Sequence, residues 1–238
     1  MKKRLKINGV VMFLATLLLA IFPAFFFRRS ASSPLDGIVE IFGIAFILLG
    51  QLIRVSARGF KSENSQNGDY LVKTGPYSLV RNPMYLGIIL IGLGAVLVLF
   101  KWWVVIIFLG FFTIRYVILI YKEEKKLKLL FPERYGNYCE EVPYRMLPSI
   151  NALLERDISE YLPLKLKWIK RELGSIIAVL ALIFLIESWE DIRYGGISAY
   201  LKELMGLAAA VILFICLAAY LIRCTINQNV TGKSKDNS

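Results

Sequence analysis

Arg81, Asn82 and Pro83 stand directly before an uncharged run that ends at Phe100. Asparagine followed by proline predicts a helix start, because Asn suits the N-cap and Pro suits the first helical position. The first N–H groups of a helix lack helical partners and carry the positive end of its dipole, so they can bind a carboxylate or phosphate. Arg81 would add a full charge to such an anion site. A plain helix start without a ligand is the alternative.

A pair of acids, Glu123 and Glu124, follows the next apolar run, residues 102–121. If the two runs form a helical hairpin, the acids return to the side on which Arg81 lies. Two polar sites would then face each other across one apolar hairpin. The alternative is a solvated helix exit whose acids are neutralised by the neighbouring lysines.

Other common reaction chemistries lack their usual residues. The chain has no histidine, and its three cysteines show no paired spacing. A Ser-His triad would lack its base, and a zinc site would lack its usual ligands. Neither a disulfide framework nor a thiolate metal site is indicated. We therefore predict no metal.

The elements that carry these residues are predicted to be membrane helices. Of the 238 residues, 57% are hydrophobic, which is more than an ordinary soluble domain contains. A helix needs about 20 apolar residues to cross the hydrocarbon core. Six segments come near this length, which predicts an all-α integral membrane protein with about six transmembrane helices. They are residues 7–27, 36–53, 84–100, 102–121, 173–187 and 203–222.

Details of these segments bear on topology and packing. The first begins like a signal peptide but lacks a small-residue cleavage site, so we expect it to be retained as a span. The third and fifth are short, and they either cross with a tilt or form a hairpin from one side. Gly92 and Gly94 in the third segment are predicted to let helices approach closely.

The distribution of Lys and Arg predicts the orientation. These residues are concentrated in the segments that share a side with the N-terminus of a six-span chain. By the positive-inside rule, both termini are cytoplasmic in a multi-pass protein. The net charge of +11 then reflects the cytoplasmic face and its anionic lipids, and we expect no nucleic-acid partner.

Five regions are predicted along the chain. They are an N-terminal helix pair, a core that holds the polar motifs, a basic interfacial segment, a C-terminal helix pair and a polar tail. Their bounds are 1–60, 61–150, 151–172, 173–226 and 227–238.

Two motifs carry a family resemblance. The stretch LVKTGPYSLVRNPMYLG, followed about forty residues later by EEKKLKLLFPERYGNYCEEVPYRMLP, resembles the isoprenylcysteine carboxyl methyltransferases and the related phospholipid methyltransferases. The resemblance covers roughly residues 69–148. It implies a cytoplasmic segment that binds S-adenosylmethionine and an acceptor held in the membrane, either a lipid or a lipidated small molecule or peptide.

The resemblance also assigns residues. Leu71, Val72, Tyr77, Asn82 and Glu123 fall where the family contacts the cofactor, and the matching residues Pro83, Tyr85, Gly87 and Glu124 are expected to support the site. On chemical grounds, Arg81 and the helix N-terminus suit the cofactor carboxylate, a glutamate suits its ammonium, and an aromatic face suits its sulfonium. The residues expected to be catalytic are Arg81, Glu123, Glu124 and, for the reason given next, Arg115.

Two departures from the carboxyl methyltransferase pattern bear on the acceptor. Asn82 replaces a histidine, and Leu119 replaces the arginine expected to hold the acceptor carboxylate. Arg115, one turn earlier in the same apolar run, could substitute, because an intramembrane charge is usually functional. A snorkelling or structurally paired arginine is the alternative for Arg115.

The predicted function is methyl transfer to a membrane acceptor, most like isoprenylcysteine carboxyl O-methylation. Phospholipid N-methylation of the phosphatidylethanolamine type is the alternative; an ammonium acceptor must first lose a proton, and only Glu123 or Glu124 is available to take it. A non-catalytic membrane protein or a transporter is a further alternative. A nicotinamide-dependent reductase is disfavoured, because no dinucleotide fingerprint is present. The oligomeric state is left open.

Overall fold

The structure is a computed structural model that describes residues 18, 21–28, 34–65, 70–148, 158–194 and 196–235. Within these ranges every regular element is a helix, apart from an isolated β-bridge between Phe27 and Phe100. The all-α prediction is confirmed for this part of the chain. The helices are α2 (Pro23–Phe26), α3 (Pro34–Asn64), α4 (Pro76–Leu79), α5 (Pro83–Leu99), α6 (Trp102–Leu130), α7 (Pro132–Glu141), α9 (Ile158–Tyr161), α10 (Leu166–Tyr194) and α11 (Gly196–Lys235).

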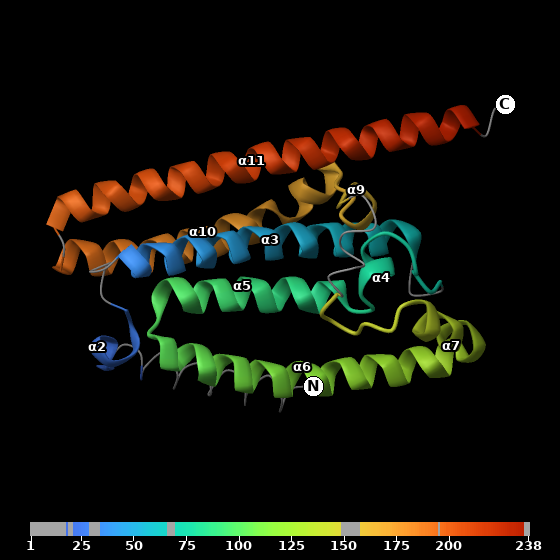
Figure 1. Cartoon of the computed structure of the whole chain (residues 1–238), viewed down its shortest axis with the longest axis horizontal. Helices are drawn as coiled ribbons and strands as arrows, with labels where there is room; N and C mark the ends of the chain where they lie inside the picture. Colours follow the sequence, from blue (N-terminus) through green and yellow to red (C-terminus); the bar gives the residue numbers. More distant parts are fainter. Residues whose placement is uncertain are drawn as a thin grey trace.

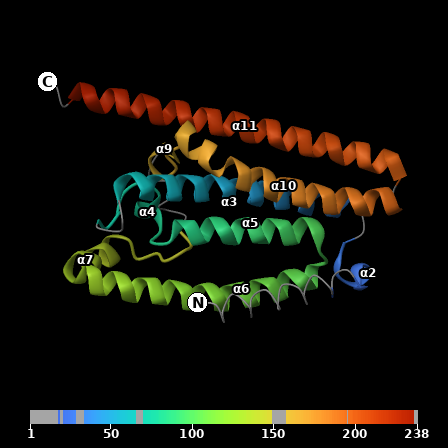
Figure 2. The same cartoon turned by 180° about the vertical axis from the view of Figure 1, so that it is seen from behind.

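The long helices run side by side along one axis (Figure 1). Helix α5 lies between α3 and α6, while α10 and α11 cover the other side of α3. The short helices α4, α7 and α9 gather at one end of the bundle, which Figure 2 shows from behind. The polar motifs therefore meet at that end.

Proline sets where many of the helices begin. It occupies the first position of α2, α3, α4, α5 and α7, where its missing N–H costs no helical hydrogen bond. Gly75 precedes α4 with a φ of 60°, a conformation that glycine adopts without strain. The predicted helix start at Asn82-Pro83 is observed, and Gly75-Pro76 forms the entry to α4.

Three helices in the described residues are long and apolar enough to cross a membrane. They contain the second, fourth and sixth predicted spans, whereas α5 is shorter, with 17 residues. The predicted span 173–187 lies inside α10, and most of the predicted span 7–27 lies outside the described residues. Six crossings thus stay a prediction. The three helices are Leu35–Asn64, Trp102–Leu130 and Leu204–Asn227.

Glycines allow α3 and α5 to pack at backbone contact. A Cβ added to Gly50 would lie 2.6 Å from the carbonyl oxygen of Gly87, and one added to Gly94 would lie 2.3 Å from that of Gly43. Only residues without a Cβ fit where backbones approach so closely. The packing role predicted for Gly94 is confirmed, while Gly92 faces the ring of Phe108 on α6.

Helix α6 is the outlying member of the bundle. Many of its large apolar side chains are exposed, including Ile106, Phe111 and Ile114. An exposed apolar surface of this kind fits a helix that faces lipid. An aromatic contact joins α6 to α5, where Tyr116 packs against Tyr85, and Phe112 packs on Tyr116 within α6.

The C-terminal helices pack on α3. A buried cluster joins Leu52 and Val55 of α3 to Trp168 and Ile176 of α10 and Leu221 of α11. Helix α11 continues to Lys235, so the described part of the predicted polar tail 227–238 is helical. The last residues of that tail, 236–238, lie outside the described residues.

Candidate functional site

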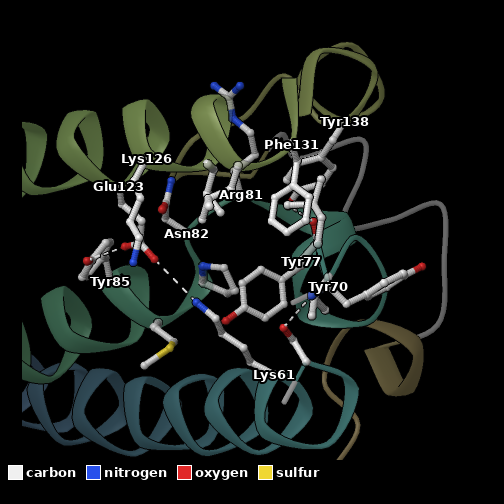
Figure 3. A pocket seen from close by; sticks show the side chains of 17 residues that line it. Lys61, Tyr70, Tyr77, Arg81, Asn82, Tyr85, Glu123, Lys126, Phe131 and Tyr138 are labelled. Atoms are coloured by element: carbon white, nitrogen blue, oxygen red, sulfur yellow. Dashed lines mark hydrogen bonds and ion pairs between the residues drawn. The ribbon is translucent and has the colours of Figure 1, made fainter. Parts of the chain in front are cut away.

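A pocket of about 270 Å³ opens where α3 ends, α5 begins and α6 passes toward α7 (Figure 3). Most of the residues that the motifs predicted for a cofactor line it. The whole lining comes from three separate stretches of the chain, which begin at Lys61, Tyr70 and Glu123, so only the folded bundle brings it together. The predicted residues that line the pocket are Leu71, Val72, Tyr77, Arg81, Asn82, Pro83, Tyr85 and Glu123.

Tyr77 forms a buried wall of the pocket. The Tyr138 hydroxyl of α7 donates a 2.7 Å hydrogen bond to the Tyr77 carbonyl oxygen, and the Tyr77 hydroxyl donates to the carbonyl of Ala57 on α3 at 3.5 Å. Burial raises the pKa of both tyrosines. They therefore stay neutral hydrogen-bond donors at physiological pH.

Glu123 supplies the acid of the pocket. Its Oε2 accepts a 2.6 Å hydrogen bond from the Tyr85 hydroxyl of α5, and its Oε1 lies 3.6 Å from the Lys61 Nζ of α3. The Glu123 side chain is 34% exposed, so the carboxylate remains accessible to a ligand. Figure 3 shows the carboxylate between Tyr85 and Lys61.

Glu124 points away from the pocket into a buried charge cluster. Its Oε1 lies 3.4 Å from Arg81 Nη2 and 3.3 Å from Arg145 Nε. The side chains of Arg81 and Glu124 are only 9% and 7% exposed. Two neighbouring acids thus have different environments, because one helical step turns Glu124 from the pocket toward the two arginines.

The start of α5 is joined to the segment after α7. Backbone N–H groups of Arg81 and Asn82 donate to the carbonyls of Tyr144 and Arg145 at 2.9 and 3.0 Å. The Asn82 side-chain amide also donates to the Arg145 carbonyl, at 3.2 Å. Asn82 therefore occupies the N-cap position without capping the helix through its side chain.

Two predicted site residues lie elsewhere. Gly87 does not line the pocket; it faces Gly50 and Arg54 at the α3–α5 contact. Arg115 is exposed on α6 and does not line the pocket either. The structure gives Gly87 a packing contact and does not bring Arg115 to the other site residues.

Several lining residues were missed by the sequence analysis. Phe131 and Tyr138 lie inside the second motif, so the resemblance could have identified them. Lys61 and Lys126 carried no signal, because isolated lysines near predicted membrane helices are common. The described residues contain no cluster of three acidic or cysteine side chains that could hold a metal ion.

The end of α3 is fixed by the segment that leads into α10. The Trp168 indole donates a 2.7 Å hydrogen bond to Glu63, and Lys165 also pairs with Glu63. Gly59 lies against the Trp168 ring, where a Cβ would come within 2.2 Å. Residues outside the two motifs thus hold the helix end that carries Lys61.

One comparison with known proteins matches part of the chain. A family model described as phospholipid methyltransferase matches residues 38–134. This match confirms the resemblance drawn from the motifs. No match to the chain was found among curated proteins or solved structures.

Proposed function

Taking the phospholipid methyltransferase match of residues 38–134 as the premise, we propose that this protein transfers a methyl group from S-adenosylmethionine to an acceptor held in the membrane. The observation that carries the proposal is the pocket itself. It gathers an accessible carboxylate, Glu123, with aromatic side chains and the first turn of α5, all from the matched motifs.

The residues present fit the methyl donor. Glu123 suits the donor's ammonium, Tyr77 and Tyr85 offer aromatic rings to its sulfonium, and Leu71 and Val72 supply apolar contact. S-adenosylmethionine supplies an activated methyl group on a positively charged sulfur leaving group. The protein then has to bind, align and exclude water, since little covalent help is needed.

The Tyr85–Glu123 hydrogen bond would support alignment. It ties the first turn of α5 to α6, and the Tyr85 ring also packs against Tyr116 of α6. A fixed carboxylate loses less entropy on binding a cation than a mobile one. We assign Glu123 to binding, Tyr85 to positioning Glu123, and Arg81 with Glu124 to holding the start of α5.

Two acceptors are consistent with the pocket. A prenylcysteine carboxylate is already ionised and needs no base, and we keep it as the first candidate. A phospholipid amine has to lose a proton, for which Glu123 is the accessible acid.

We further propose that the pocket faces the cytoplasm, with both termini on that side. The positive-inside distribution supports this orientation. In a background free of native cysteines, single cysteines at positions 122 and 140 should react with an impermeant reagent from the cytoplasmic side only. Labelling of the two positions from opposite sides would contradict the arrangement.

The first test is calorimetric binding of S-adenosylmethionine to the detergent-solubilised protein. We expect binding by the parent chain, loss of binding in Glu123→Gln, and no change in Glu140→Gln, which alters an exposed acid of α7 outside the pocket. A folded protein that does not bind the donor would favour the non-catalytic or transport alternative.

The second test separates the acceptors. The protein is incubated with donor labelled on its methyl group and with either phosphatidylethanolamine vesicles or an S-prenylated cysteine. An alkali-labile label would identify a methyl ester, while a stable label in the lipid would identify an N-methylated headgroup. Glu123→Gln serves as the inactive control in both reactions.

A further inference from the structure

We propose that Lys61 binds an oxyanion of the ligand, a role that Arg81 was expected to fill. This inference rests on the proposed function, because it concerns the same pocket. The chemical group is a carboxylate or a phosphate, and it can come from the methyl donor or from the headgroup of the acceptor lipid.

Arg81 already has partners within the protein. Its Nη2 lies 3.4 Å from Glu124 and 3.5 Å from the Pro143 carbonyl. Figure 3 shows its guanidinium directed toward the α6–α7 side, away from Lys61. If this buried arginine left the buried carboxylate, Glu124 would keep only the exposed Arg145 as a partner, which is costly for a charge in a buried position.

Lys61, in contrast, is accessible to a ligand. Its Nζ lies 3.6 Å from Glu123, and the two side chains are 44% and 34% exposed. An ion pair that is so accessible to solvent contributes little. A ligand with both charges can replace it, because an ammonium would take Glu123 and an oxyanion would take Lys61.

The pocket has an excess of positive charge. With Arg81 paired to Glu124, the remaining charged lining groups are Lys61, Lys126 and Glu123. One acid beside two lysines leaves an excess of positive charge, so the pocket favours a ligand with at least one anionic group. Lys126, from α6, is the second of these lysines.

The helix end that carries Lys61 is held in place. Glu63, two residues further along α3, binds both Lys165 and Trp168, and the Ser62 hydroxyl accepts a 3.2 Å hydrogen bond from Arg171 Nη1. The final turn of α3 is thereby fixed against α10. A lysine on a fixed backbone loses less freedom when it binds than one on a frayed helix end.

The test compares S-adenosylmethionine with its decarboxylated form, which keeps the ammonium and sulfonium. If the oxyanion is the donor carboxylate, Lys61→Gln should weaken binding of the intact donor about tenfold or more. Binding of the decarboxylated form should stay equal or improve, since Glu123 loses its competing partner. Lys61→Arg should restore the preference for the intact donor, and Lys122→Gln, an exposed lysine outside the pocket, should not alter it.

A second arm tests the lipid as the source. Retention of radiolabelled phosphatidylethanolamine on the immobilised protein is compared with that of a long-chain alkylamine, which has no phosphate. A loss in Lys61→Gln that is confined to the phospholipid would assign the oxyanion to the lipid phosphate.

The outcomes separate the two proposals. If the parent chain binds no donor, the proposed function fails, while the lipid arm still tests Lys61. If the parent chain binds the donor and Lys61→Gln changes neither the donor preference nor the lipid preference, the role of Lys61 is overturned and the proposed function stands.

Discussion

The Tyr85 hydroxyl donates a 2.6 Å hydrogen bond to the carboxylate of Glu123, which joins the first turn of α5 to the end of the apolar part of α6. Both residues line the pocket. The same carboxylate faces Lys61 of α3. Three helices that are distant in sequence thus share one acid, and the position of that acid depends on all three.

Tyr85→Phe should weaken binding of S-adenosylmethionine about tenfold, because a hydrogen bond to a charged group contributes about 1.5–3 kcal/mol. The fold should be retained, since the aromatic ring that contacts Tyr116 is kept. Calorimetric titration measures the affinity. Tyr121→Phe, an exposed residue of α6 outside the pocket, is the matched control. Equal affinities in the two variants would remove Tyr85 from the positioning role.

Arg81→Met should destabilise the protein by about 3 kcal/mol, because it leaves the buried Glu124 with only the exposed Arg145 as a partner. Adding Glu124→Gln should recover much of that loss, since the unpaired charge is removed. Chemical unfolding in detergent micelles of the single and double variants gives the coupling between the two residues. Additive effects would show that the pair is not coupled.

Gly50→Ala and Gly87→Ala should each lower the unfolding temperature, because the new Cβ would lie 2.6 or 2.7 Å from a backbone oxygen of the facing helix. Overpacking of this kind costs about 1–3 kcal/mol. Gly110→Ala and Gly174→Ala are matched controls, since a Cβ there meets nothing within 4 Å. Thermal unfolding in micelles should show no loss for the controls. A loss of similar size in all four would mean that helix contact is not the cause.

The ionisation of Tyr77 and Tyr138 should require a pH above the usual tyrosine value of about 10, because burial raises the pKa of both. The folded protein then holds these protons more tightly than the unfolded chain. The stability that they contribute is fully present below about pH 10 and is lost as the pH rises through their raised pKa values.

Tyrosinate absorbance of native and denatured protein, with Tyr138→Phe as the control, measures this effect. The native parent chain should titrate later than its denatured form, and the difference should shrink in the variant. Identical native and denatured titrations would contradict the burial argument.

Much of the fold followed from local sequence patterns. Long apolar runs indicated helices, and the Asn82-Pro83 pair marked the helix start at Pro83, because these effects depend on the residues themselves and their immediate neighbours. The family resemblance likewise rested on contiguous motifs, and the match of residues 38–134 confirms it.

Contacts between distant residues were decided by the tertiary structure alone. Glu123 and Glu124 are adjacent and chemically identical, yet one faces the pocket and the other faces Arg81. Lys61 lies outside both motifs, but packing of α3 against α5 and α10 brings it to Glu123. The sequence thus determined which helices form and which motifs they carry, including those that resemble the methyltransferase family. Which charges meet in the pocket was decided only by packing, because a side chain's partners depend on the helices that surround it.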